Sequence, residues 1–378
     1  MKKANTAVCI FFLIVLAVLT VLSIVNPVRE RSETENRELA QMPEFSAESV
    51  FDGSFTKGYE DFVVDQFIWR DTWIQMKSSV ERALGKTLSN GVYFADDGYY
   101  IEHKSESDLN SELLEKNIGY LKVFCDKMSD AISGDAVVSI APTAALVHSD
   151  RLPRFNDEFD WGGTLDSISG LLGEDFVELR GVLDEHKDEY IYYRTDHHWT
   201  TDGAYYAYTE IIKKFGFEPL GREEFNRVAV NEDFLGTVIA KLNVQTKPDT
   251  IVRYDPKVPL ELSVSYNLGA KKTDTLYAAE KLQTRDKYAY FLGGNDALLE
   301  IETGIKNGRT LMLAKDSYAN CMIPFLACHF EKIYVVDLRY FNLGVVEYTE
   351  TVGDITDALV LYNISGFADD RYVFKLAR

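Results

Sequence analysis

Cysteine is scarce in this sequence of 378 residues, which contains only four. The four show no Cys-x-x-Cys pair and no regular spacing, so the sequence offers no cysteine framework. We expect Cys321 and Cys328, which can share one face of a helix, to be buried thiols. A disulfide from either of them to Cys125 cannot be read from the sequence, because a bridge requires a specific approach in space.

Basic residues are also in deficit, with 40 Lys and Arg against 60 Asp and Glu and a formal net charge of -20. A chain this acidic is repelled by phosphate groups, which argues against a nucleic-acid partner. The charge favours solubility and is compatible with a neutral or hydroxyl-rich substrate such as a sugar. Internal repeats and low-complexity tracts are absent from the sequence. The length allows one large domain or two modest ones.

Only one long hydrophobic run is present, close to the N-terminus. Lys2 and Lys3 precede a run over residues 6–25 that contains few polar side chains. The run is long enough to cross a bilayer core of about 30 Å as one helix, and the two lysines favour an N-terminus inside the cell. A cleaved signal peptide is the alternative, but residues 23–27 offer no Ala-x-Ala pattern.

We therefore expect the chain to have three parts. Residues 1–25 form a cytoplasmic tip and a transmembrane anchor, which crosses the membrane with residues 6–25. Residues 26–50 are charged and form a linker. Residues 51–378 form an α/β domain, which this topology places outside the cytoplasm.

Hydrophobic periodicity predicts the elements of that domain. Aromatic residues recur at helical spacing over residues 51–84, so we expect one or two amphipathic helices there, with Trp69 and Trp73 packed in the core. A turn signal between two short apolar runs predicts a hairpin over residues 90–101. Continuous apolar runs and helical periodicity predict strands at 136–141, 190–193, 310–314, 333–337 and 358–362, and helices at 109–128, 164–172 and 202–215.

Apolar strands separated by helices predict an α/β fold with a mostly parallel sheet and helices on both faces. Residues from about 220 to 296 differ, because they are rich in Val, Thr and Tyr and show little helical periodicity. We expect an irregular β-rich insertion there. Binding sites on parallel sheets lie beyond the carboxyl ends of the strands, and Asp196, His198 and Ser317 all follow predicted strands.

These three residues supply the groups that serine acyl transfer requires. A serine hydroxyl needs an imidazole to take its proton and a carboxylate to hold the imidazole tautomer. In an extended chain Asp196 and His198 point to the same side and His197 points away. We therefore predict Ser317 as nucleophile, His198 as base and Asp196 as the group that orients it. His197 would be a structural or substrate-side residue.

Residues near Ser317 are candidates for substrate binding. A turn and a short helix with Pro324 in its first turn follow the predicted strand, so the backbone N–H groups of Ser317 and Tyr318 can stabilise an oxyanion. Asn320 can add a side-chain donor. Arg339, just past another predicted strand, can contact substrate.

A metal site is the competing interpretation of the histidine segment. Asp196, His197, His198 and Asp202 all carry potential ligand atoms. Adjacent histidines point apart in extended chain, and the spacing matches no helical ligand pattern. We therefore predict no metal.

The segment at residues 195–200, Thr-Asp-His-His-Trp-Thr, contains the motif that names the bacterial DHHW proteins. The resemblance covers nearly the whole chain after the apolar run. It also rests on the segments at residues 32–37, 52–55, 141–143, 291–295, 315–320 and 337–341.

The DHHW family is similar to the SGNH-hydrolase-like O-acetyltransferases that modify alginate and other exported polysaccharides. Those enzymes carry an Asp-x-His-Trp motif and, later, a serine after a strand, and Asp196, His198 and Ser317 match these positions in that order. The resemblance implies an SGNH-hydrolase-like fold with a permuted motif order, since ordinary SGNH hydrolases place the nucleophile first. It also adds Trp199 to the candidate substrate-binding residues.

Residues 293–296 match the Gly-x-Asn-Asp motif of ordinary SGNH enzymes. The motif lies between the histidine segment and Ser317, where a plain circular permutation would not place it. We therefore expect a turn there, with Asn295 as a candidate oxyanion donor.

The resemblance implies an O-acetyltransferase mechanism. Ser317 accepts an acetyl group with His198 as base, and a hydroxyl of a polysaccharide then attacks the acyl-enzyme. The implied donor comes from a membrane-bound O-acyltransferase partner, and no cofactor is implied.

Two alternatives remain open on the sequence. One is an acetyl esterase with the same machinery, in which water replaces the sugar. The other is a non-catalytic, membrane-tethered glycan-binding or scaffold protein, which the aromatic residues Tyr99, Tyr100, Tyr340 and Phe341 suggest if they lie on the surface.

Overall fold

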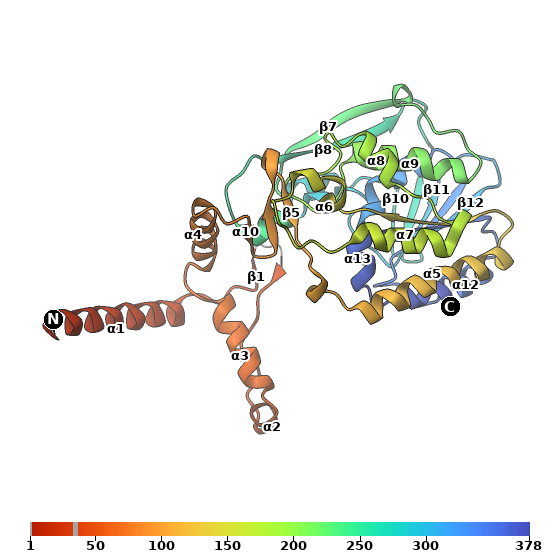
Figure 1. Cartoon of the computed structure of the whole chain (residues 1–378). Helices are drawn as coiled ribbons and strands as arrows, with labels where there is room; N and C mark the ends of the chain where they lie inside the picture. The colour runs from red at the N-terminus through yellow and green to blue at the C-terminus, as the bar shows by residue number, and fades with distance from the viewer. Residues whose placement is uncertain (1, 33–36) are drawn as a thin grey trace. The chain divides into compact units, whose positions relative to one another are not determined.

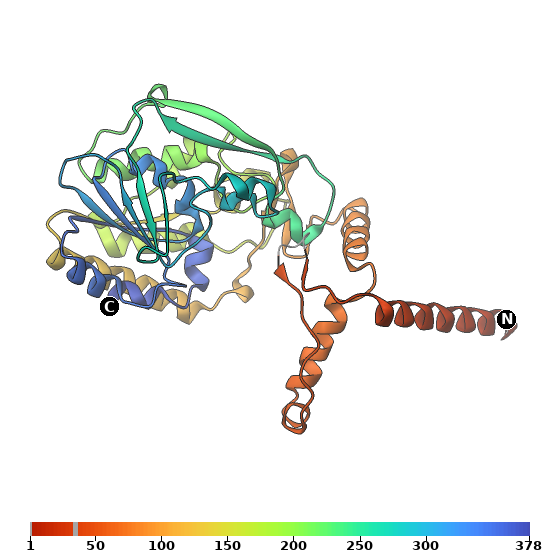
Figure 2. The same cartoon turned by 180° about the vertical axis from the view of Figure 1, so that it is seen from behind.

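The structure of the chain is a computed structural model that describes residues 2–32 and 37–378. Residues 33–36, which belong to the predicted linker and to one of the family-like segments, lie outside the described residues. The contacts divide the chain into two compact units, one of Met1–Ser89 with Ile239–Thr246 and one of Asn90–Val238 with Lys247–Arg378 (Figure 1, Figure 2). The expected domain bounds at residues 25 and 50 stay predictions.

The first unit contains the N-terminal apolar helix. Its elements are α1 (Lys2–Val25), β1 (Arg31–Ser32), β2 (Arg37–Glu38), α2 (Ala47–Phe51), α3 (Ser54–Asp65), α4 (Arg70–Ala83) and β3 (Leu88–Ser89). Within α1, Asn5–Val25 has a mean hydropathy of 3.2 and is long and apolar enough to cross a membrane. An N-terminal helix of this kind is either a membrane anchor or a signal sequence.

One prediction about the first unit is corrected by the exposure of its side chains. Trp69 and Trp73, expected in the core, are exposed. The segment after α1, whose role as a linker stays a prediction, forms hydrogen bonds with polar side chains of α3 and its C-cap. Gln66 accepts from the Arg29 N–H at 2.9 Å and donates to the Arg29 carbonyl at 2.8 Å. Asp65 forms two hydrogen bonds with Arg37, at 2.8 and 2.5 Å.

The second unit contains the sheet and its helices. Its α-helices are α5 (Ser111–Ala131), α6 (Ala144–Val147), α7 (Trp161–Leu172), α8 (Arg180–Glu185), α9 (Thr201–Lys214), α11 (Ile323–Leu326), α12 (Val345–Val352) and α13 (Ile364–Asp369). The helix α10 (Thr237–Leu242) begins in this unit and continues into the first unit after Val238.

Short 3-10 helices connect many of these elements. They are η1 (Asp96–Gly98), η2 (Glu106–Asp108), η3 (Ser149–Arg151), η4 (Gly173–Asp175), η5 (Arg222–Glu224), η6 (Ala279–Gln283), η7 (Lys287–Tyr290), η8 (Ser317–Cys321) and η9 (Val373–Ala377).

Its strands are β4 (Val92–Phe94), β5 (Tyr100–Glu102), β6 (Ala136–Ala141), β7 (Phe225–Phe234), β8 (Asp249–Pro256), β9 (Ser263–Tyr266), β10 (Lys271–Thr273), β11 (Leu298–Glu302), β12 (Thr310–Lys315), β13 (Lys332–Val336) and β14 (Asp357–Asn363). Seven of them form the central sheet in the order β10-β9-β11-β13-β12-β14-β6. The four strands from β13 to β6 are parallel, and β11, β9 and β10 pair antiparallel. The predicted α/β class is confirmed, and the sheet is mixed. Within its parallel part, β12 is an interior strand between β13 and β14.

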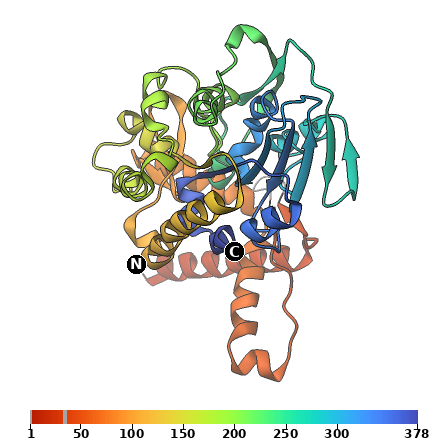
Figure 3. The ribbon, with the colours of Figure 1, turned by 90° about the vertical axis from the view of Figure 1, so that its right-hand side faces the viewer.

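The parallel strands are apolar along their whole length because both sheet faces are covered. Every residue of β6, β12 and β14 is buried. Their side chains on one face join a core with α5, α7 and α12. Figures 1 and 3 show α5 and α12 on one side of the sheet and α9 on the other. Burial on both faces is what continuous hydrophobic strands require.

Two further predictions are corrected here, and one is not tested. Residues 190–193 form no strand, and only a single bridge joins Tyr192 to Trp199. The stretch at about 220–296 contains β7, β8, β9 and β10; β7 and β8 pair as a hairpin, and β9 and β10 join the edge of the central sheet. That this stretch is an insertion stays a prediction. Of the four aromatics expected on the surface, Tyr99, Tyr100 and Phe341 are buried, and only Tyr340 is exposed.

All four cysteines are free thiols. Cys125 and Cys321 are buried, which agrees with the prediction for Cys321, and Cys328 is partly buried. No disulfide therefore constrains the described residues.

Candidate active site

Ser317 lies at the carboxyl end of β12, where the strand turns into η8. Asp316 caps this short helix: one carboxylate oxygen accepts from the Tyr318 N–H at 2.9 Å and the other from the Asn363 N–H at 2.8 Å. Burial raises the pKa of Asp316 to about 6, while these two hydrogen bonds oppose that shift. The Ser317 N–H, at the first position of η8, has no acceptor within that helix. The cap therefore fixes the serine and leaves its own amide available.

The histidine segment is a bent loop before α9. The Thr200 side chain caps α9 by accepting from the Gly203 N–H at 3.3 Å. At the other end of the loop, buried Asp249 accepts from the N–H and hydroxyl of Thr195 at 2.8 and 2.5 Å. These contacts fix both ends of the loop, and residues 196–198 project from between them.

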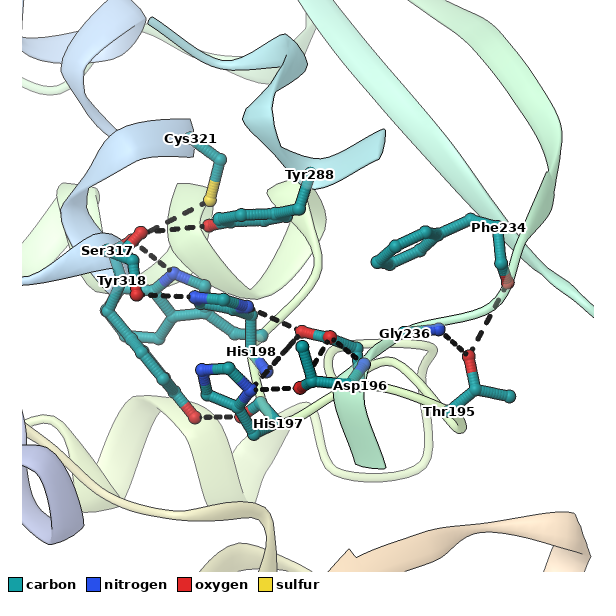
Figure 4. A network of polar contacts seen from close by, with 12 residues as sticks. Thr195, Asp196, His197, His198, Phe234, Gly236, Tyr288, Ser317, Tyr318 and Cys321 are labelled. Atoms are coloured by element: carbon teal, nitrogen blue, oxygen red, sulfur yellow. Dashed lines mark hydrogen bonds and ion pairs between the residues drawn. The ribbon is translucent and has the colours of Figure 1, made fainter. Parts of the chain in front are cut away.

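The loop and the serine turn meet in one chain of hydrogen bonds (Figure 4). The Ser317 hydroxyl lies 2.7 Å from Nε2 of His198. Nδ1 of the same ring lies 2.5 Å from Oδ1 of Asp196. His198 and Ser317 are 119 positions apart in sequence. The arrangement has the connectivity of a Ser-His-Asp relay.

Asp196 is held as a carboxylate by several donors. It accepts from the His198 N–H at 3.1 Å and from the N–H and hydroxyl of Thr237 at 2.8 and 3.1 Å. Burial by itself raises the pKa of this carboxyl, but the two histidines and the hydrogen bonds outweigh it and hold the pKa well below its ordinary value. Gly236 packs so closely that a Cβ on it would overlap the Asp196 side chain.

The His198 ring is neutral in this environment. Burial, with a smaller contribution from His197, lowers its pKa to about 4 against the opposing effect of Asp196. The Tyr288 ring stacks on it, with centroids 3.8 Å apart and an interplanar angle of 13°. The Tyr288 hydroxyl donates to the Ser317 carbonyl at 3.2 Å. One side chain thus contacts both the imidazole and the serine backbone.

His197 does not face away from His198, as the extended-chain argument expected. The two rings are 3.9 Å apart with an angle of 36°, because residues 194–198 are bent rather than extended. Nδ1 of His197 lies 2.8 Å from the Thr237 hydroxyl. The premise was wrong, although the Asp196–His198 contact that it predicted is present.

A cavity of about 590 Å³ opens beside Ser317. Ser317, Tyr318 and Arg339 line it, together with His197 and several residues of the segment from Tyr362 to Tyr372. The Arg339 guanidinium is held by Asp337 through Nε and Nη2 at 2.8 and 2.5 Å. Its Nη1 has no hydrogen-bond partner among the residues that the structure describes.

Other predicted binding residues lie elsewhere. The Tyr318 N–H is occupied by Asp316, which competes with its expected oxyanion role. Trp199 is fully buried, and its Nε1 donates to the Tyr318 carbonyl at 2.9 Å. Oδ1 of Asn295 accepts from Lys315 at 2.7 Å and from Asn320 at 3.2 Å. The side-chain amides of Asn295 and Asn320 therefore stabilise the turn that contains Ser317. None of Trp199, Asn295 and Asn320 lines the cavity.

Gly236, Thr237 and Tyr288 were not identified from the sequence. Each belongs to the stretch interpreted as an insertion, and no motif links it to the histidines. A Gly-Thr pair such as Gly236–Thr237 is a helix-start signal, which is too common to mark a site.

The histidine segment also contains a group that could hold a metal ion. The ligand atoms of Asp196, His197 and His198 lie within 4.8 Å of one another. Both nitrogens of His198 and Nδ1 of His197 already contact the protein groups given above. A metal ion would have to displace those hydrogen bonds.

Comparison with known proteins gives matches in both sequence and structure. A family model described as DHHW protein matches residues 175–336, which include the histidine segment and Ser317. A DHHW family protein from Eubacterium siraeum is 24% identical with a TM-score of 0.63, over 76% of this chain and 95% of that chain. Bacillus cereus PatB1 with a sulfonyl adduct is 17% identical with a TM-score of 0.63, over 76% of this chain and 98% of that chain.

The O-acetyltransferase domain of Pseudomonas putida AlgJ is 13% identical with a TM-score of 0.48, over 76% of this chain and 98% of that chain. No curated protein matches this chain in sequence. The first two structures show that the chain shares their fold. The segment at residues 175–336 is similar to the DHHW proteins.

Proposed function

We propose that the chain is an O-acetyltransferase that moves an acetyl group onto hydroxyls of a cell-surface or exported polysaccharide. The observation that carries the proposal is the hydrogen-bonded set of Ser317, His198 and Asp196, with distances of 2.7 and 2.5 Å, beside an open cavity. The motif resemblance to SGNH-hydrolase-like acetyltransferases, with its permuted order of base and nucleophile, supports it further.

In the proposed reaction, Ser317 attacks the carbonyl carbon of an acetyl ester while Nε2 of His198 takes the hydroxyl proton. We assign stabilisation of the oxyanion to the Ser317 N–H, and contact with the substrate to Arg339, which lines the same cavity. The ester bond to the donor then breaks, and the departing oxygen takes the proton from His198. A sugar hydroxyl next attacks the acetyl-serine carbonyl and gives its proton to His198. The bond between the acetyl carbon and Oγ of Ser317 then breaks, Oγ takes the proton from His198, and the acetyl group leaves on the sugar.

The proposed site of action is outside the cytoplasm. The support is α1, which is apolar enough to cross a membrane, together with Lys2 and Lys3 before it. A donor supplied by a membrane-bound O-acyltransferase belongs to the same proposal.

The test is acetylation of Ser317 by an acetyl ester donor, measured by mass spectrometry of the peptide. We expect a mass increase of one acetyl group in the unaltered protein and none in Ser317→Ala. His198→Ala should lose most of the rate, of the order of 10²–10⁴-fold. His197→Ala is the matched control and should lose far less. An unlabelled serine in a folded protein, or equal losses from both histidine variants, would contradict the proposal. Product analysis with a glycan acceptor separates transfer from hydrolysis.

A further inference from the structure

The helix α4 exposes its apolar side to solvent. Trp69 precedes the helix as its N-cap, and the exposed side chains continue along one stripe at helical spacing. The stripe is between 40% and 77% exposed and consists of Trp69, Trp73, Met76, Val80 and Leu84.

The opposite side of α4 is the buried one, and it is polar. Ser78 is the buried residue of the helix, and the Arg70 side chain is only 13% exposed. A helix on a soluble domain normally turns its apolar stripe inward. The reversed pattern in α4 therefore calls for an apolar partner outside the chain.

The start of α4 is joined to the end of the apolar helix α1. The Ile68 N–H donates to the Ser23 hydroxyl at 3.3 Å. Ser23 lies two residues before Val25, where α1 ends. Arg29 then forms an ion pair with Asp71 in the first turn of α4, at 3.0 Å. Trp69 thus lies beside the end of the segment that is apolar enough to cross a membrane.

We propose that α4 lies on the membrane surface and inserts this stripe among the lipids. The inference rests on the proposed membrane insertion of α1 and goes beyond it, because it fixes a second contact with the same bilayer. A segment of 21 residues spans about 30 Å as a helix, so its end reaches the interface between acyl chains and headgroups. Tryptophan is enriched in that layer, and amphipathic helices lie in its plane.

Lipid is favoured over a protein partner by this continuity. A helix that lies beside the end of a membrane-spanning α1 is surrounded by lipid molecules, whether or not a protein partner is also present. The stripe also combines two tryptophans with flexible or aliphatic side chains and carries no acidic or basic residue. Holding α4 there would restrict how far the chain beyond it can move from the bilayer.

Tryptophan fluorescence of the full chain in phosphatidylcholine vesicles tests the proposal. The chain has four tryptophans, and the other two, Trp161 and Trp199, are buried. We expect brominated phosphatidylcholine to quench the emission and the double variant Trp69→Phe, Trp73→Phe to lose that quenching. Acrylamide in the water should quench the reconstituted protein weakly.

Flotation of the vesicles separates this inference from the proposed anchor. If the protein floats with the vesicles but acrylamide quenches Trp69 and Trp73 and bromolipid does not, α4 faces water and the inference is wrong. If neither quencher reaches them, a second copy of the chain covers the stripe, and the inference is again wrong. If the protein does not float, the anchor and the inference fail together. Acetylation of Ser317, measured in the same vesicles, tests the enzyme proposal independently.

Discussion

Outside the proposed relay itself, Tyr288 contacts both His198 and Ser317. Its ring stacks on His198 and its hydroxyl bonds to the Ser317 carbonyl. The stack keeps water from one face of the imidazole, and burial is the main reason that the pKa of His198 lies below its ordinary value. Tyr288 is therefore a positioning residue, which acts on the reaction only through His198 and Ser317.

Replacing Tyr288 by Leu should lower kcat/KM by about 10²-fold, because the imidazole loses its lateral support. Water would also reach the ring, so the pKa of His198 should rise toward its ordinary value. Since the base works only when neutral, the acidic limb of the pH–rate profile should move to higher pH. The measurement is kcat/KM from pH 4 to 8.

Tyr288→Phe is the matched control, because it keeps the stack and removes only the hydroxyl. We expect its acidic limb to stay where it is in the unaltered protein. If the Leu variant loses rate with an unmoved limb, Tyr288 supports the fold but does not set the state of His198.

At the scale of elements, the carboxylate of the relay depends on a segment that shares no motif with it. Strand β7 ends at Phe234, and Gly236 and Thr237 then pass directly against Asp196. The Gly236 N–H also donates to the Thr195 hydroxyl at 3.0 Å, so the two loops are bonded at two points. The approach is so close that only a residue without a Cβ fits.

Gly236→Ala should therefore displace Asp196 and reduce kcat/KM by about 10²-fold or more, since a misplaced orienting group leaves the base in the wrong geometry. Gly119→Ala is the matched control, because a Cβ at Gly119 in α5 meets no atom within 4 Å. That variant should keep full activity and equal or higher stability, as alanine favours helix over glycine. An active Gly236→Ala protein would show that the relay tolerates movement of Asp196.

At the scale of the whole molecule, buried histidines make stability depend on pH. His148 is fully buried between Tyr99 and Tyr192, with ring centroids at 5.0 and 5.6 Å. Neither of its nitrogens has a hydrogen-bond partner among the residues that the structure describes. Burial lowers its pKa to about 4. The unfolded chain, with an ordinary histidine, binds a proton at higher pH than the folded one.

The sign follows from that difference. As pH falls below about 6.5, protons bind the unfolded state and the free energy of unfolding decreases, by about 2 kcal/mol for His148 between pH 7 and 5. His148→Phe keeps the ring volume and removes the titration, so this variant should lose about 2 kcal/mol less over the same range. Urea unfolding at the two pH values measures the difference. Equal losses in both proteins would mean that His148 is protonated in the folded state.

The sequence alone determined most of the sheet and its order along the chain. The strands at residues 136–141, 310–315, 332–336 and 357–363 were predicted within two residues, because continuous apolar runs bounded by turn residues are a local signal. It also singled out Ser317 and the pair Asp196 and His198. Both signals are local: a serine after a buried strand and an Asp-x-His triple can be recognised without knowing which other segments lie nearby.

The tertiary structure alone decided what surrounds those groups. Tyr288 and Gly236 reach the relay across long sequence separations, and the bend that brings His197 against His198 is imposed by Asp249 and Thr237 from other segments. The exposure of the apolar side of α4 could not be predicted from the sequence either. A periodic stripe shows that one face of a helix is apolar, but not whether that face packs against the core. The physical reason is the same in each case: periodicity is encoded locally, whereas burial and approach depend on which distant segments the fold brings together.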